Sequence, residues 1–210
     1  MAVAPSRLAR WFAGFAERNG EIDSIRGAHG QTVVTTRRGG TAIIEGIERS
    51  GDGIEALIES LRPSGTAVVV LIRRGGYSIA TATFDGDAVT VTRSKTGSRY
   101  VQGRTAAGGQ SQQRFARRRA NQTAALVGSA VDTARHVLGD HPAPVDLLVT
   151  GGDLPLVDVA LAARPLATLA RDRQVHVQVG EPRRADIDRA LASALEVTIV
   201  VTNADEETGA

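Results

Sequence analysis

The sequence contains no cysteine, and aromatic residues make up only 3% of its 210 positions. Without cysteine, neither disulfides nor thiolate metal sites can form. No stretch approaches the roughly 18 consecutive apolar residues that a membrane-spanning helix needs, and the N-terminus lacks the apolar centre of a secretory signal. We therefore expect a cytoplasmic protein with no membrane contact, long enough to bury a core without cross-links.

Sites for metals and for common hydrolytic chemistry are also missing from the sequence. The four histidines stand in no spacing that is typical of zinc ligands. There is no Gly-x-Ser-x-Gly nucleophile elbow. Asp153, which follows a pair of glycines, is the one carboxylate that stands out as a candidate. We expect no bound metal and no cofactor.

Positive charge is unevenly distributed along the chain. Lysine and arginine number 25 against 23 acidic residues, which gives a net charge of only +2. Many of the arginines, however, lie between Arg93 and Arg119. Such local clustering favours contact with nucleic acid more strongly than the total charge does. Because aromatic side chains are scarce, the contact is expected to be with phosphates rather than with stacked bases.

A glycine-rich segment inside this basic region ends in glutamines. Gly108 and Gly109 lack side chains, so another molecule could approach their backbone closely. Gln110 follows directly, and Gln112 and Gln113 stand just behind it. Glutamine does not titrate, but its amide can orient a water molecule and donate a hydrogen bond. These groups suit hydrolysis of an activated ester, in which positioning does most of the catalysis.

A helix lined with arginine is expected immediately after these glutamines. Arg114, Arg117 and Arg118 are spaced at i, i+3 and i+4, so they share one helix face, and Arg119 widens it. Guanidinium groups in such a row can hold phosphates. Arg99 and Arg104, which precede the glycines, add to the expected RNA-binding set. A plain glycine-rich connector followed by a solvated basic helix is the structural alternative.

The run GGQSQQRFARRR, Gly108 to Arg119, resembles the tip and stem of the catalytic domain of eukaryotic and archaeal class I release factors. The wider run that begins at Ser98 resembles the bacterial, actinobacterial-type Vms-like release factors, which are peptidyl-tRNA hydrolases. The resemblance implies that Gly108, Gly109 and Gln110 form the catalytic tripeptide. Gln112 competes with Gln110, because Gly109 to Gln112 also fits the Gly-x-x-Gln pattern of the eukaryotic relatives.

The resemblance implies a ribosome-associated peptidyl-tRNA hydrolase that frees nascent chains from stalled large ribosomal subunits. Its partners would be peptidyl-tRNA and the large ribosomal subunit, and we expect it to act as a monomer. Two alternatives remain open at this point. The protein could be a nuclease that cuts the tRNA acceptor end, or a factor that binds tRNA or the ribosome without catalysis.

The expected fold is α/β, a layered mixed β-sheet with crossover helices, similar to the release-factor catalytic domain. Apolar spacing predicts a helix over Ser6–Glu17, a buried strand over Thr66–Ile72 and one long helix over Ser111–Leu138. Strands and helices then alternate, with a last strand at Val197–Val201 closing the same sheet.

Three regions are expected along the chain. Residues 1–62 should form an N-terminal helix and a hairpin of Gln31–Thr36 with Thr41–Ile47, packed on the main domain. Residues 63–202 should form the release-factor-like domain with its reactive loop at 97–113. Residues 203–210 should be a disordered tail.

Overall fold

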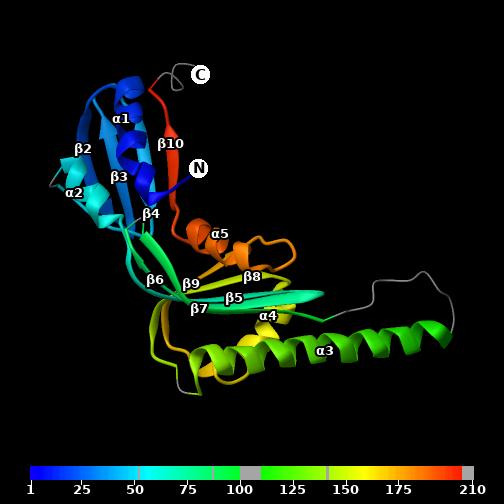
Figure 1. The fold of residues 1–210 in the computed structure, drawn as a ribbon. Coiled ribbons are helices and arrows are strands. Elements are labelled where there is room, and N and C mark those ends of the chain that lie inside the picture. The colour runs from blue at the N-terminus through cyan, green and yellow to red at the C-terminus, as the bar shows by residue number, and fades with distance from the viewer. Residues whose placement is uncertain (52, 87, 100–109, 141, 205–210) are drawn as a thin grey trace. The chain divides into compact units, whose positions relative to one another are not determined.

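The structure is a computed structural model that describes residues 1–51, 53–86, 88–99, 110–140 and 142–204 (Figure 1). The chain divides into two compact units, each described by itself. The N-terminal unit comprises Met1–Pro63, Asp85–Asp87 and Leu195–Ala210, and the central unit comprises Ser64–Phe84 and Ala88–Ala194.

The N-terminal unit is built on a five-stranded sheet in the order β1-β10-β4-β3-β2, whose paired strands run antiparallel. A short 3-10 turn, η1 (Pro5–Arg7), and two helices, α1 (Leu8–Asn19) and α2 (Gly53–Ser60), complete the unit. The strands are β1 (Ala2–Val3), β2 (Ile22–Ala28), β3 (Gln31–Thr36), β4 (Thr41–Glu45) and β10 (Val197–Thr202).

Helix α1 follows from the apolar spacing that the sequence predicts. Leu8, Phe12 and Phe15 recur on one face, and all three are buried in the core of the unit. The helix ends at Gly20, whose φ of 85° lies in the left-handed region that glycine tolerates. The predicted helix and the β3–β4 hairpin are confirmed, whereas β2, which pairs with β3, had not been expected.

The last strand pairs differently from the expectation. We expected Val197–Val201 to close the sheet of residues 63–202, but β10 lies between β1 and β4 of the N-terminal unit. Its burial alternates around the fully buried Ile199, as in an antiparallel strand with one covered face. The sequence of a strand shows this alternation but does not show which sheet the strand joins. The position of residues 197–201 after β9 in the chain suggested the central sheet, which is wrong.

A buried asparagine fastens the end of this strand to α1. The side-chain amide of Asn19 donates to Asn203 at 3.2 Å, and its oxygen accepts from the Ala204 N–H at 2.9 Å. Asn203 and Ala204 are thus held in place, although we expected the tail to begin at residue 203. The rest of the expected tail, 205–210, lies outside the described residues.

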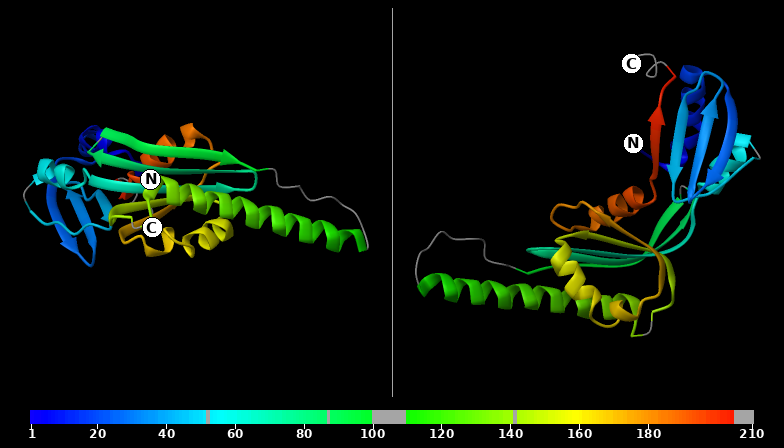
Figure 2. Two further views of the ribbon diagram at one scale, coloured as in Figure 1. Left: turned by 60° about the horizontal axis from the view of Figure 1, so that its bottom comes forward. Right: turned by 180° about the vertical axis from the view of Figure 1, so that it is seen from behind.

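The central unit is a layered α/β structure around a mixed five-stranded sheet in the order β7-β6-β5-β8-β9. The strand β8 runs parallel to both β5 and β9, which requires crossover connections. Helices α3 and α4 cover one face of the sheet and α5 the other (Figures 1 and 2). The expected fold class is confirmed. The strands are β5 (Ser64–Arg73), β6 (Gly76–Asp85), β7 (Ala88–Ser98), β8 (Val145–Gly152) and β9 (Arg171–Val177), and the helices are α3 (Gln110–Leu138), α4 (Leu154–Leu161) and α5 (Arg184–Ala194).

The middle of this sheet is its most buried part. Strand β5 is covered on both faces, and its residues 67–72 are all buried, as the apolar run Thr66–Ile72 predicts. Gly152, at φ 95°, lies so close to the carbonyl of Ile72 that an added Cβ would overlap with it. The Gly151–Gly152 pair therefore serves close packing of strands β8 and β5.

A carboxylate joins the starts of the two central parallel strands. Asp146 of β8 accepts hydrogen bonds from the Thr66 N–H at 2.6 Å and from the Thr66 hydroxyl at 3.0 Å. The backbone N–H, followed by the hydroxyl, holds the pKa of the Asp146 carboxyl below its ordinary value of 3.8. This group therefore stabilises the fold above pH 3.8, and the contribution is lost as the pH falls through the lowered pKa.

We expect Asp146→Asn to lower the Tm at neutral pH, because an amide oxygen accepts these hydrogen bonds more weakly than a carboxylate does. The difference in Tm between wild type and variant should shrink as the pH is taken below about 3.8. Thermal unfolding followed by circular dichroism across this range measures both. A difference in Tm that stays constant down to the lowest pH would contradict the assignment.

Candidate functional site

The long helix α3 has a buried half and an exposed half. From residue 113 onward, the first buried side chain is Leu126, and Ala130, Ala134 and Val137 continue the stripe into the core of the central unit. Residues 113–125 are exposed or half-buried. Since a helix rises 1.5 Å per residue, Gln110 stands about 24 Å along the axis from Leu126. The N-terminal half of α3 extends beyond the sheet, as Figure 1 shows.

An arginine-lined groove runs along the exposed half of α3. The side chains that form it come from α3 at helical spacing and from the residue just after β7, and they enclose about 640 Å³. No carboxylate lines the groove, and none of its arginines forms an ion pair with a described carboxylate. The lining residues are Arg99, Arg114, Arg117, Arg118, Asn121, Gln122 and Ala125.

Four of the six arginines predicted to bind RNA therefore meet in one place. Arg119 is half-buried and is not among the groove residues, although we expected it to widen the same face. Arg104 lies outside the described residues. Asn121 and Gln122 were not predicted, yet they lie seven and eight positions after Arg114, so helical periodicity would have indicated them.

Arg99 fixes the end of β7 to the middle of α3. One guanidinium nitrogen donates to the carbonyl of Ala125 at 3.1 Å and lies 3.3 Å from the Ser129 hydroxyl. The Arg99 N–H donates to the carbonyl of Gly75, in the turn before β6, at 2.9 Å. The point where the chain leaves the sheet for residues 100–109 is thus held from two sides.

The segment before the loop is more regular than the sequence indicates. We expected a reactive loop over 97–113, but Gly97 and Ser98 continue strand β7 and residues 110–113 belong to α3. The backbone of Gln110 and Gln112 lies in the first turn of α3. The glycines predicted to be catalytic, Gly108 and Gly109, lie outside the described residues.

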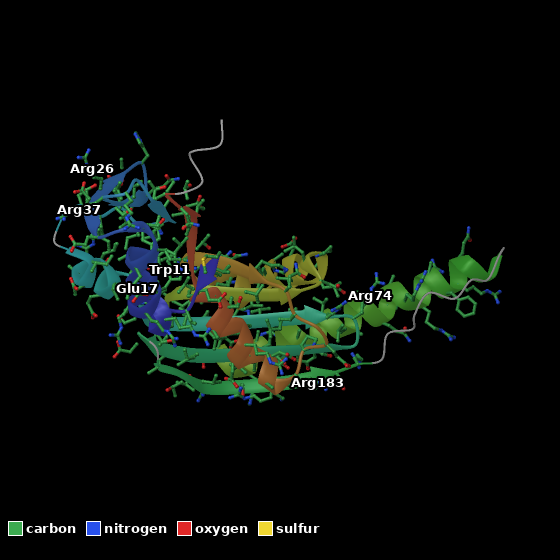
Figure 3. All side chains as sticks on the ribbon, turned by 90° about the horizontal axis from the view of Figure 1, so that it is seen from above. Trp11, Glu17, Arg26, Arg37, Arg74 and Arg183 are labelled. Atoms are coloured by element: carbon green, nitrogen blue, oxygen red, sulfur yellow. The ribbon has the colours of Figure 1, made fainter. Side chains whose placement is uncertain are left out.

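A second, smaller recess of about 520 Å³ lies where β5 and β8 end. It is lined by Arg73, Arg74, Thr123, Asp153, Pro155 and Leu156. Asp153, the carboxylate singled out in the sequence, accepts the Arg74 N–H at 3.2 Å and precedes α4. Arg74 lies next to α3 in Figure 3. Because its carboxylate is used in fixing the β5–β6 turn, we interpret Asp153 as structural.

Within the described residues, no group of three or more histidine, aspartate or glutamate side chains could hold a metal ion. The described helices also include none long and apolar enough to cross a membrane.

The fold and the groove define an α/β protein with a projecting helix that presents a cationic surface and that follows a glycine-rich segment in the sequence. Residues 65–200 match a family model described as acVLRF1, the Actinobacteria/chloroflexi VLRF1 release factor. The match spans more than half of the chain, so the chain belongs to this release-factor family. The resemblance to the Vms-like release factors is thereby confirmed.

Similarity to individual proteins is weak. The crystal structure of the archaeal translation termination factor aRF1 shares 9% sequence identity with this chain at a TM-score of 0.31, over 92% of this chain and 72% of that one. A structure described as "Archaeal protein" gives 9% identity and a TM-score of 0.26, over 92% and 74%. No curated protein sequence matches. Likenesses at this level support no conclusion about the site.

The packing of β7 against Tyr77, which in turn contacts α3, can be tested by substitution. An added Cβ at Gly97 would overlap with the Tyr77 ring, whose hydroxyl accepts from the Thr133 hydroxyl of α3 at 3.1 Å. Overpacking of this kind costs about 1–3 kcal/mol. We expect Gly97→Ala to lower the free energy of unfolding by that amount in urea denaturation. Gly128→Ala, at a helix position with open space, should not destabilise the protein.

Proposed function

We propose that this protein is a peptidyl-tRNA hydrolase that acts as a monomer on stalled large ribosomal subunits and releases their nascent chains. The observation that supports the proposal is the arginine groove on α3, which begins one helical turn after Gln110. Arg114 and Arg118 follow Gln110 by about 6 and 12 Å along the axis. Phosphates of an acceptor end held by these arginines would place the ester next to the glutamines.

Helical periodicity favours Gln110 over Gln112 as the catalytic residue. Position 110 is in line with positions 114, 117 and 121, which belong to the groove face, because residues spaced by three and four share a face. Position 112 is about 200° away from position 110 around the axis. An ester presented along the groove would therefore meet Gln110 first.

In the proposed reaction, a water molecule attacks the carbonyl carbon of the peptidyl ester. The bond between that carbon and the tRNA ribose oxygen then breaks, and the ribose oxygen takes up the proton lost by the water. The Gln110 side chain would orient the water, since it accepts and donates without titrating. The N–H groups in the first turn of α3 lack intrahelical partners, so they could stabilise the developing oxyanion.

We expect Gln110→Ala to slow peptide release by roughly 10²-fold or more, the usual effect of removing one group that stabilises the transition state. Gln112→Ala should have a smaller effect, because position 112 lies about 200° away from position 110 around the helix axis. The measurement is single-turnover release of labelled peptide from peptidyl-tRNA on purified large subunits. Undiminished release by both Gln110→Ala and Gln112→Ala would rule out the glutamine mechanism.

The same assay separates the alternative functions. Analysis of the tRNA product by gel should show an intact acceptor end that can be charged again. A shortened tRNA would indicate a nuclease, and binding without any released peptide would indicate a non-catalytic factor.

The groove itself predicts a specific salt dependence of tRNA binding. Each phosphate contact contributes roughly 0.7–0.9 to the slope of log K against log salt concentration. Replacing both Arg117 and Arg118 with glutamine should therefore reduce the slope by about 1.4–1.8 in fluorescence titrations with deacylated tRNA. Arg119→Gln removes the same charge from the same helix outside the groove and should change the slope less. Equal effects per charge at all three positions would contradict a defined groove.

A further inference from the structure

The N-terminal unit contains a second arginine-lined groove, which the proposed hydrolase site does not use. It encloses about 900 Å³ between α1 and the segment that forms β1. One face of η1 and α1 supplies its side chains at helical spacing: Arg7, Arg10, Trp11, Gly14 and Arg18. Met1, Ala2, Val3, Ala4, Ser6 and Glu196 complete the lining.

The charges in this groove are not compensated. Arg7, Arg10 and Arg18 are exposed, and none of them forms an ion pair with a described carboxylate. Elsewhere in the same unit, Arg37 is paired with Glu21 at 2.8 Å. Glu196 is the one carboxylate in the lining, against three guanidinium groups.

Gly14 has no conformational reason to be a glycine. It lies in the interior of α1 without a positive φ, where glycine destabilises a helix by about 0.5–1 kcal/mol relative to alanine. An added Cβ would meet only the guanidinium of Arg18, at 3.3 Å. The missing side chain leaves the floor of the groove open and lets Arg18 lie across it.

The wall beside Gly14 is rigid. Trp11 stacks on Phe15 with a ring-centroid distance of 5.5 Å and 7° between the planes, and it meets Phe12 edge-on at 4.8 Å. Phe12 and Phe15 are buried, so the indole packs on the core; Figure 3 labels Trp11. The arginines therefore flank an indole that is held by the core.

We propose that this α1 groove binds the phosphate backbone of an RNA strand, as a second RNA contact besides the groove on α3. From Arg7 to Arg18 the row extends about 16 Å along the helix axis, which suits a linear polyanion better than a single small anion. Guanidinium groups pair with phosphate oxygens in a planar, two-pronged geometry. The proposal rests on the proposed function for the source of the RNA, the large ribosomal subunit.

The test uses the full-length protein and a fluorescein-labelled single-stranded uridine 12-mer, with anisotropy measured over a series of KCl concentrations. Arg10→Gln combined with Arg18→Gln should lower the slope of log K against log salt concentration by about 1.4, since each single-strand contact contributes roughly 0.7. Arg26→Gln is the control, because Arg26 is an exposed arginine of the same unit outside the groove and forms no ion pair with a described carboxylate. The double variant removes two charges and the control removes one, so equal reductions of the slope per charge removed would overturn the proposal.

Gly14→Ala separates binding from folding. The substitution should keep or raise the Tm, because alanine favours the helix, while RNA binding should weaken because the methyl group fills the groove floor and pushes against the Arg18 guanidinium. Binding as tight as that of wild type would show that the groove floor plays no part and would overturn the proposal. Displacement of the RNA by a polyglutamate 12-mer at equal concentration would also overturn the proposal. It would show that the groove binds the carboxylates of an acidic protein partner instead of RNA phosphates.

The peptide-release assay distinguishes the two proposals. Release that depends on Gln110, together with an unchanged salt slope in the Arg10/Arg18 double variant, would retain the hydrolase and reject the α1 groove. A reduced slope in that variant, with no peptide release by wild type, would retain the groove and reject the hydrolase.

Discussion

Burial of the second half of α3 is the constraint on which the candidate site depends. Leu126, Ala130 and Ala134 are fully buried against the sheet and α4. Burying apolar side chains of this kind contributes about 25 cal/mol per Å² of area removed from water. This burial holds α3 in place from residue 126 onward. Because the helix backbone is continuous, the half that carries the arginines lies along the same axis. A helix with arginines alone, and no packed half, would have no such support.

The charged half of α3 would not be stable by itself. Like charges at i and i+4, as with Arg114 and Arg118, destabilise a helix by roughly 0.2–0.5 kcal/mol per pair. The structure offers these arginines no carboxylate partners within the groove, so the repulsion is relieved only by solvent and salt. Arg99 is an exception, because two groups on α3 accept its guanidinium. A polyanion would bind most favourably to such a surface, because it would relieve the repulsion between arginines that have no carboxylate partner in the groove.

The sequence predicts features that depend on local spacing, and it does not predict those that depend on partner choice. Periodicity indicated α1, α3 and the arginine face, and an unbroken apolar run indicated β5. The position of β10 could not be read in this way, because the alternation around Ile199 fits a strand with one covered face in either sheet. The contact of Arg99 with Ala125 is equally hidden, since 26 residues separate the two in the chain. The catalytic role of the glycines stays a prediction, because Gly108 and Gly109 lie outside the described residues.

A glutamine mechanism makes unusual demands on the rest of the molecule. An acid–base residue can raise a rate by its pKa, whereas a glutamine contributes only where its amide is placed. Placement in turn requires that the RNA be held by groups whose own positions are fixed relative to the glutamine. On α3, the arginine face and position 110 belong to one hydrogen-bonded helix, so the spacing between them is set by helix geometry. If Gln110 acts as proposed, the cationic stem of α3 would be the physical counterpart of a catalytic residue that does not titrate.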